Sequence, residues 1–290
     1  PRDRRRLIII TATKARNMAN HFHHRLGQAW QQSGSLVCVG LDPDLSRIPA
    51  VVRDSAAPLF EFCKAIVDST AAYVCAFKPQ FAHFAALKAE GQLADVIAYV
   101  HDRYPHIPVL LDAKRGDIGS TAEYYAREAF ERYNADAVTV SPYLGYESIA
   151  PYFDYPDRGV VVLCRTSNPG SDRLQMIDAG GTPLYLRVAE WVKELDQNNQ
   201  CLLVTGATYP EELGMVREIV GNMPLLVPGI GAQGGDLERV LKNGLDGERA
   251  GLLISSSRGI LYAGDGPDFA AAAGFAARTL SDQINALRKS

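Results

Sequence analysis

Short apolar runs recur along the chain, each ending at turn-forming or charged residues. Most of them are apolar at consecutive positions and rich in valine and leucine, as expected for strands that are covered on both faces. Strands of this kind are typical of a parallel sheet. The eight runs span residues 36–40, 73–77, 108–112, 137–141, 160–164, 201–205, 225–229 and 251–255.

Segments with helical periodicity separate most of these runs. They cover residues 58–72, 84–104, 183–196, 209–220 and 236–244. Alternating strands and helices predict parallel strands joined by helical crossovers, and eight such units in roughly 250 residues match a (β/α)8 barrel. We therefore predict a single-domain α/β fold, a TIM barrel over residues 19–290, with a doubly wound open sheet as the alternative. The unit after the fourth strand is irregular, because residues 145–158 offer only a short helix.

The composition is that of an ordinary globular protein. Of the 290 residues, 47% are hydrophobic and 22% charged, and the formal net charge is −3. That balance gives no reason to expect nucleic acid or an anionic membrane as a partner, and no apolar run approaches the length of a transmembrane helix. Five cysteines lie singly, without the close pairs of a metal site. We interpret them as buried, reduced thiols of a cytosolic protein.

The first residues do not follow the barrel pattern. The basic start and the apolar LIII are too short for a signal peptide, so residues 1–18 are interpreted as a tag, an upstream segment or a disordered one. A histidine cluster, His21, His23 and His24, comes next. An exposed helix start is favoured over a metal site there, because no acidic or cysteine partner lies nearby.

Charge is concentrated where the third apolar run ends, in the sequence LLDAKRGDIGST. Asp112 and Lys114 are two residues apart, so in extended backbone their side chains point to the same side. Lys78 ends the second run and Asp42 ends the first. Because the carboxyl ends of parallel strands meet at one rim of a barrel, we expect Lys78, Asp112 and Lys114 to form a line of alternating charge.

Arg115 and Asp117 have two interpretations. Ser120 and Glu123 form a capping box, which predicts a helix that begins near Thr121. In the simpler interpretation Asp117 caps this helix and Arg115 makes a solvated ion pair. In the functional interpretation Asp117 points away from its own barrel and reaches into a neighbouring subunit.

Two loops near the end of the chain predict a phosphate site. Residues 229–234, GIGAQG, match the glycine pattern of dinucleotide-binding loops, but they follow the seventh strand and no acidic residue ends the next one. Their glycines still let backbone N–H groups approach an anion. Arg258 follows the eighth strand, and the loops after strands seven and eight are the habitual phosphate site of these barrels. Together the two loops predict a site for a phosphate monoester.

These motifs resemble one known family. DAKRGDIGST, with Lys78 upstream and PGIGAQGGD and SSRGI downstream, is similar to orotidine 5′-phosphate decarboxylase, and most of all to its longer bacterial subfamily. The resemblance covers residues 19–290. It implies a cytosolic carboxy-lyase of pyrimidine biosynthesis that forms UMP from orotidine 5′-phosphate as a homodimer, without metal or cofactor. No segment resembles a phosphoribosyltransferase.

The resemblance also implies roles for individual residues. The catalytic charge network would consist of Lys78, Asp112, Lys114 and Asp117. Lys114 would protonate C6 of the pyrimidine, while Asp117 and Thr121 would come from the partner subunit. Substrate contacts would be made by Asp42 at the ribose, Ser167 at the pyrimidine, and Pro228, Gly229, Gln233 and Arg258 at the phosphate end. Arg165 and Thr166, which precede Ser167, differ from the residues of other members.

Three other functions stay open from the residues alone. A metal-dependent sugar-phosphate enzyme, such as a hexulose-phosphate synthase, would need a glutamate near Lys78, where the chain has Gln80. A Schiff-base aldolase would need Lys78 or Lys114 without a close carboxylate, which the DAK sequence disfavours. A barrel that only binds a nucleotide would have no need for four gathered charges.

Overall fold

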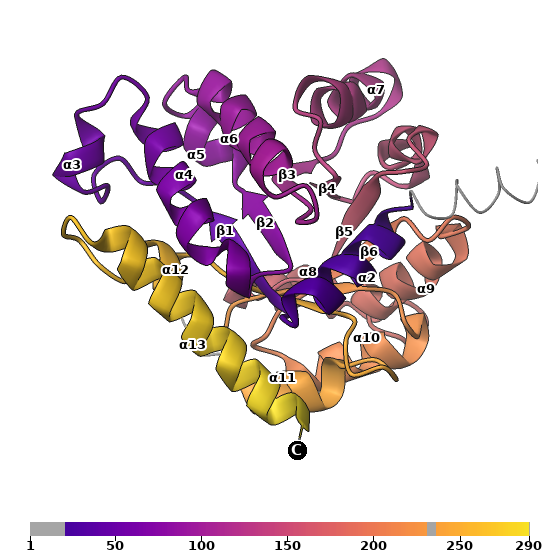
Figure 1. Cartoon of the computed structure of the whole chain (residues 1–290). Coiled ribbons are helices and arrows are strands. Elements are labelled where there is room, and N and C mark those ends of the chain that lie inside the picture. Colours follow the sequence, from indigo (N-terminus) through magenta and orange to yellow (C-terminus); the bar gives the residue numbers. More distant parts are fainter. Residues whose placement is uncertain (1–20, 231–235, 290) are drawn as a thin grey trace, which may run out of the picture.

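Eight parallel strands form one sheet in the computed structural model of the chain, which describes residues 21–230 and 236–289 (Figure 1). The strands follow the order β2-β1-β8-β7-β6-β5-β4-β3. Parallel bridges from Phe77 to Val109 and from Gln80 to Asp112 join the two outer strands, so the sheet closes on itself. The predicted (β/α)8 barrel is confirmed and the open-sheet alternative is wrong. The segment 1–18 lies outside the described residues.

Every predicted apolar run overlaps a strand. The overlap is smallest at β2, because Ala71–Tyr73 form a 3-10 turn (η1) ahead of it and Lys78 lies inside the strand. The strands are β1 (Val37–Leu41), β2 (Ala76–Pro79), β3 (Leu110–Arg115), β4 (Ala137–Val140), β5 (Gly159–Arg165), β6 (Cys201–Thr205), β7 (Leu225–Pro228) and β8 (Leu252–Ser256).

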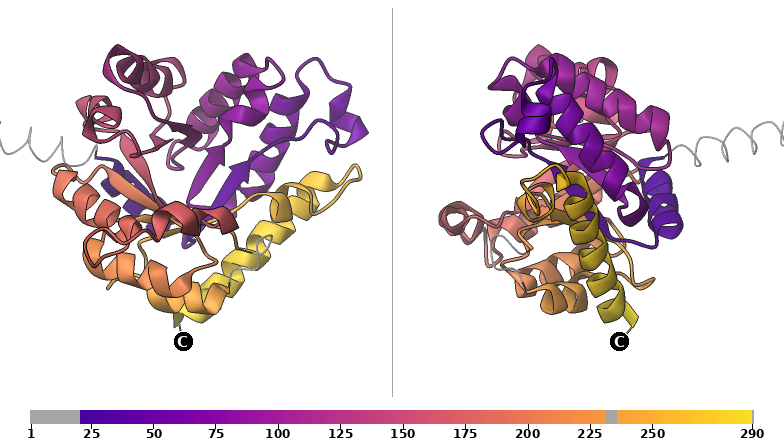
Figure 2. Two further views of the ribbon diagram at one scale, coloured as in Figure 1. Left: turned by 180° about the vertical axis from the view of Figure 1, so that it is seen from behind. Right: turned by 60° about the vertical axis from the view of Figure 1, so that its left-hand side comes forward.

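Helices surround the strands on the outside of the barrel, as Figures 1 and 2 show. They bury one apolar layer between helices and strands, and a smaller cluster fills the barrel interior. The α-helices are α2 (Phe22–Ser33), α3 (Ala50–Arg53), α4 (Pro58–Thr70), α5 (Phe81–Ala85), α6 (Glu90–Arg103), α7 (Gly119–Arg127), α8 (Asp172–Gln175), α9 (Leu184–Leu195), α10 (Pro210–Val220), α11 (Leu237–Gly244), α12 (Arg258–Leu261) and α13 (Phe269–Lys289). A π-helical turn, η2 (Glu128–Arg132), extends α7, and 3-10 turns η3 (Tyr146–Ser148), η4 (Ala150–Asp154) and η5 (Pro169–Ser171) fill the irregular loops.

Within the described ranges, no helix combines the length and the apolar character that a membrane crossing requires. The five cysteines are all buried and free, as predicted. Burial raises the pKa of each thiol, so these side chains are protonated hydrophobic groups of the core.

Two helix predictions need correction. The single helix expected over 84–104 is two helices, α5 and α6, because Lys88 adopts a left-handed backbone with φ +54° and ends the first one. Helix α7 begins at Gly119 rather than near Thr121, and no side chain caps its first turn. The expected capping box is therefore absent, since Ser120 already lies within the helix.

Helix α2 closes the bottom of the barrel, where the strands begin. Phe22 and Leu26 belong to the interior cluster, and the His23 ring nitrogen Nε2 hydrogen-bonds the carbonyl oxygen of Cys201 at 2.7 Å. The predicted helix start is correct, but it is packed rather than exposed. The cause is a contact between segments far apart in the sequence, which periodicity does not report.

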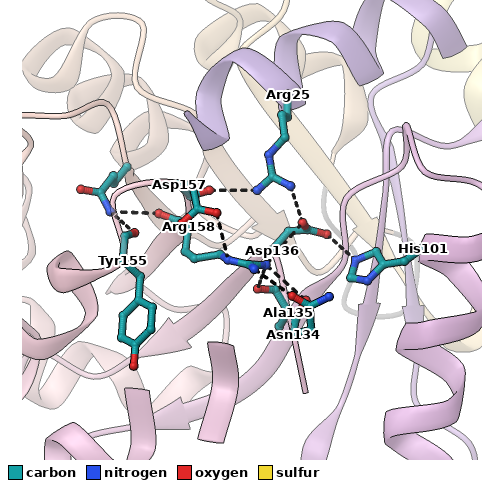
Figure 3. A network of polar contacts seen from close by, with 9 residues as sticks. Arg25, His101, Asn134, Ala135, Asp136, Tyr155, Asp157 and Arg158 are labelled. Carbon is teal, nitrogen blue, oxygen red and sulfur yellow. Dashed lines mark hydrogen bonds and ion pairs between the residues drawn. The ribbon is translucent and has the colours of Figure 1, made fainter. Parts of the chain in front are cut away.

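A network around Asp136 fastens this helix to the barrel (Figure 3). One carboxylate oxygen of Asp136 accepts a hydrogen bond from Arg25 of α2 at 2.5 Å. The other oxygen bonds the His101 ring at 2.9 Å and the Val109 backbone N–H at 2.8 Å. Burial would raise the pKa of Asp136, but the His101 hydrogen bond and the Arg25 charge hold it below its ordinary value. The network joins α2, α6 and the starts of β3 and β4.

We expect Asp136→Asn to lower the free energy of unfolding by about 3 kcal/mol at neutral pH, because it removes the buried negative charge that pairs with the partly buried Arg25 guanidinium and bonds the His101 ring. A depressed pKa gives stability that is present above the ordinary carboxyl value and lost as pH falls through the folded-state value. The difference between variant and wild type should therefore shrink below about pH 4, the ordinary carboxyl pKa. Urea unfolding across this pH range measures it.

Asp282→Asn is the matched control, because Asp282 and Arg278 form an exposed ion pair on α13. This control should change stability little at any pH. An Asp136→Asn penalty that stayed constant into the acid range would contradict the assignment of the effect to the ionised carboxylate.

Candidate active site

The predicted charge line lies at the carboxyl ends of β2 and β3. Nζ of Lys78 lies 2.8 Å from Oδ2 of Asp112, and Nζ of Lys114 lies 2.6 Å from Oδ1 of the same carboxylate. Thr139 of β4 donates its hydroxyl to that Oδ1 at 2.9 Å. The alternating arrangement expected from the sequence is therefore present, with one carboxylate shared by two ammonium groups and a hydroxyl.

Burial and charge act in opposite directions on this cluster. Burial alone would raise the pKa of Asp112, but Lys78 and Lys114 outweigh it and hold that pKa well below its ordinary value. Burial alone would lower the pKa of Lys78, but Asp112 and Asp42 raise it above its ordinary value. Lys78 and Asp112 are consequently fixed, opposite charges throughout the neutral pH range.

Lys114 reaches the cluster through an unusual backbone. Its φ angle is +47°, in the left-handed region that residues with a Cβ atom rarely adopt. The pairing of β3 with β4 is irregular here, and the N–H groups of Ala113 and Lys114 both donate to Thr139 Oγ1, at 3.0 and 2.9 Å. The expected extended backbone from Asp112 to Lys114 is therefore wrong. A distortion held by Thr139 brings the two side chains together instead.

Sequence reasoning missed Thr139. The residue is 1% exposed and lies in the middle of an otherwise apolar strand. The available signal was a hydroxyl group in the strand that follows the DAK motif, and that signal is weak because threonine is common in β-strands.

A cavity of about 920 Å³ opens above the charge line at the mouth of the barrel. Two of the predicted substrate residues, Ser167 and Pro228, line it together with Lys78, Asp112 and Lys114. Residues of η5 and α8 form part of its wall, and this segment crosses in front of the strands in the left view of Figure 2. The volume suits a small-molecule ligand.

Arg165 supports this wall. The residue ends β5, is 1% exposed and donates to Ser171 Oγ and to the Asp172 carboxylate, both at 2.6 Å. Its guanidinium carbon lies 3.7 Å from the centre of the Tyr209 ring. Arg165 therefore holds the segment that carries Ser167, although the guanidinium itself is not part of the cavity lining.

The other predicted substrate residues are less closely gathered. Asp42 follows β1 and is partly buried, and its Oδ1 atom is buried without a hydrogen-bond partner. Gly229 follows β7 with φ +105°, and Arg258 is an exposed residue at the start of α12. Gln233 lies outside the described residues. The phosphate site accordingly stays a prediction.

Asp117 and Thr121 do not join the charge line of their own chain. Within the described residues, neither lines the cavity. Asp117 accepts a hydrogen bond from the neighbouring Ile118 N–H at 2.8 Å, and Thr121 lies exposed on the first turn of α7. This placement agrees with a residue that serves its own loop, and equally with one that points toward another subunit.

Arg115 is not the solvated residue that one interpretation expected. Its guanidinium pairs with Glu128 at 2.9 Å, and its central carbon lies 4.2 Å from the Phe81 ring centre and 4.7 Å from that of Tyr125. Its side chain is 18% exposed. Arg115 therefore anchors the β3–α7 connection to the helices around it, because its N–H groups bond a carboxylate while the flat face of its guanidinium packs on aromatic rings.

Comparison with known proteins agrees with this geometry. A family model described as "Orotidine 5'-phosphate decarboxylase / HUMPS family" matches residues 35–273. Orotidine 5′-phosphate decarboxylase of Azoarcus sp. (strain BH72) is 58% identical over 269 residues, which cover 92% of this chain and 100% of the relative. The enzyme of the same name from Ralstonia nicotianae is 56% identical over 268 residues, 92% of this chain and 99% of the relative.

A solved structure, OMP decarboxylase of Leishmania donovani, superposes with a TM-score of 0.82 at 41% sequence identity. The match covers 93% of this chain and 100% of that one. With the family model and the relatives in agreement over nearly the whole length, the chain belongs to the orotidine 5′-phosphate decarboxylase / HUMPS family.

Proposed function

We propose that this chain decarboxylates orotidine 5′-phosphate to UMP and CO₂ at the charge line of Lys78, Asp112 and Lys114. Relatives that are 54% to 58% identical carry the name of this activity, the last step of UMP synthesis. The observation that carries the assignment of the site is the shared carboxylate of Asp112, with both of its oxygens bound to ammonium groups at the mouth of the barrel.

The proposed chemistry follows from the charges. Loss of CO₂ leaves a carbanion at C6 of the pyrimidine, and no carbonyl group of the ring is positioned to delocalise it. A preorganised ammonium group stabilises such a charge as it develops, since it needs no reorganisation during the reaction. Lys114, which is about half exposed toward the cavity, would then transfer its proton to C6. No cofactor is needed for this sequence of steps.

Asp112 and Lys78 would preorganise that centre. Asp112 holds Lys114 by a 2.6 Å contact, and Lys78 balances the charge of Asp112 from the other side. Asp112 would also lie close to the departing carboxylate, where like charge raises the energy of the bound substrate.

Substrate contacts away from the reacting bond would supply orientation. We assign Ser167 to the pyrimidine, Asp42 to the ribose, and the two C-terminal loops to the phosphate through Pro228, Gly229, Gln233 and Arg258. Binding energy from a remote phosphate can be used to orient the reacting centre, so these residues would contribute to the rate without touching C6.

We also propose a homodimer in which Asp117 and Thr121 complete the site of the partner subunit. Several apolar side chains are exposed at the start of α7, on α7 and in the segment after β4, whose turn η3 contacts α7: Ile118, Tyr124, Tyr143, Leu144 and Tyr146. Exposed apolar side chains on neighbouring segments are typical of a protein interface. A cytosolic location is proposed with it, and the five free thiols support that location.

The metal-dependent alternative differs at one position. Such an enzyme would need a glutamate near Lys78, and this chain has Gln80 directly after β2. The side-chain oxygen of Gln80 accepts a hydrogen bond from the Ala82 N–H at the start of α5. The relatives named above also favour the decarboxylase.

The deciding experiment follows the near-ultraviolet absorbance of orotidine 5′-phosphate after addition of purified protein, with a chelator present and no cofactor. Rapid loss of this absorbance with formation of UMP is expected. Persistent absorbance from folded protein that binds UMP would contradict the proposal, and sugar phosphates with Mg²⁺ would then be tested.

A further inference from the structure

Tyr262 links two of the loops that the proposed function assigns to the substrate. It comes directly after α12, and its backbone N–H donates to the carbonyl oxygen of Arg258 at 3.3 Å. Its hydroxyl lies at the end of β1: it donates to the carbonyl oxygen of Asp42 at 3.2 Å and accepts from the Asp44 N–H at 2.6 Å. One side chain therefore joins the Arg258 segment to the backbone that carries Asp42.

The ring of Tyr262 is held in place by contacts that do not involve its hydroxyl. Phe62 stacks against it, with ring centres 5.8 Å apart and planes 16° apart. The Arg47 guanidinium carbon lies 3.8 Å from the ring centre. Burial raises the pKa of Tyr262 to about 12, so the hydroxyl keeps its proton at neutral pH and can donate to Asp42.

The Asp42 carboxylate has an oxygen atom that is available to accept a hydrogen bond from a ligand. Its Oδ1 atom is buried and has no hydrogen-bond partner, and a buried polar atom in that state is costly unless a ligand satisfies it. The orientation of the carboxylate depends on its backbone, and that backbone is what the Tyr262 hydroxyl holds.

A second close approach ties the same two strand ends together. A Cβ atom at Gly40 would lie 1.9 Å from Ser257 Oγ and 3.0 Å from Ser257 Cβ, so a side chain at Gly40 would displace Ser257, the residue before Arg258. The segments around Asp42 and Arg258 thus pack against each other, and the Tyr262 hydroxyl supplies the hydrogen bonds between them.

We propose that Tyr262 is a positioning residue, which holds the Asp42 carboxylate at the ribose hydroxyls of the nucleotide by bonding the Asp42–Asp44 backbone. The inference rests on the proposed function, because it takes Asp42 to be the ribose contact. Tyr262 itself touches no substrate atom. Its effect should therefore appear only with ligands that possess the hydroxyls Asp42 recognises.

The test compares Tyr262→Phe with wild type in calorimetric binding of UMP and of 2′,3′-dideoxy-UMP. The variant keeps the stacked ring and removes only the hydroxyl. We expect the affinity for UMP to fall about tenfold, the size of one well-placed hydrogen bond, while the affinity for the dideoxy nucleotide changes less than about twofold. Equal losses for both ligands, or no loss for either, would overturn the inference.

Three further variants separate its failure from that of the proposed function. Asp42→Ala should weaken the binding of UMP and leave the binding of the dideoxy nucleotide unchanged. If Asp42→Ala changed neither affinity, or changed both equally, the ribose role of Asp42 itself would be overturned. The double variant with Tyr262→Phe should lose no more than Asp42→Ala alone, because the hydroxyl acts through that carboxylate; additive losses would contradict this. Tyr133→Phe removes a buried hydroxyl without a partner and should leave both affinities unchanged.

Discussion

Replacing Lys114 with alanine is expected to reduce kcat for orotidine 5′-phosphate by at least about 10⁴-fold, because the variant loses both a general acid and the charge that stabilises the carbanion. The fold should survive. Asp112 keeps Lys78 at 2.8 Å and the Thr139 hydroxyl at 2.9 Å, so its buried carboxylate stays paired. The lysine side chain is 49% exposed, so little packing is lost.

UMP lacks the departing carboxylate and carries no charge at C6, so we expect the Lys114→Ala variant to bind it within about tenfold of wild type. Absorbance kinetics and calorimetry measure the two quantities. Lys64→Ala is the matched control, because Lys64 lies on α4 with an exposed partner, Glu61. A folded variant that has lost UMP binding would contradict the role of Lys114, and so would one that keeps a tenth of the activity.

Mixing two inactive variants is expected to restore activity if Asp117 serves the partner subunit. Lys114→Ala and Asp117→Ala should each be nearly inactive alone. In a mixed dimer, the barrel that retains Lys114 receives the intact Asp117 of the other chain, so one of its two sites is complete. With random pairing of equal amounts, roughly a quarter of all sites are rebuilt, and about that share of wild-type activity should return.

The control mixes Lys114→Ala with Lys78→Ala. Both residues belong to the same barrel, where Lys78 and Lys114 bind the two oxygens of one carboxylate. Each mixed dimer then has a defect in both sites, so no activity should return. Variants carrying different tags allow the mixed dimers to be purified and assayed directly. An inactive mixture of Lys114→Ala with Asp117→Ala, in purified mixed dimers, would place Asp117 outside the partner's site.

Much of the barrel was readable from local patterns. The eight strands follow from continuous apolar runs, because a strand covered on both faces has few polar positions. The Lys78–Asp112–Lys114 line was also predictable, since each of its residues follows an apolar run and the ends of parallel strands share one rim. Local composition and the order of segments carried this information.

Other features depend on contacts between distant segments. The left-handed backbone at Lys114 is held by Thr139, which lies in the next strand and looks like any strand threonine in the sequence. The packing of α2 under the barrel and the break at Lys88 are of the same kind. Tyr262 belongs here too, since its hydroxyl bonds residues more than two hundred positions away.

The division has a physical cause. Periodicity along a chain reports which side of an element is buried, so it determines the strands, most of the helices and the rim at which their ends gather. It does not report which polar atoms meet across that rim, because hydrogen-bond partners are chosen by the geometry of the closed barrel. The sequence therefore sufficed for the fold and the charged residues, while closure of the barrel set the backbone and the hydroxyl groups that hold those charges in place.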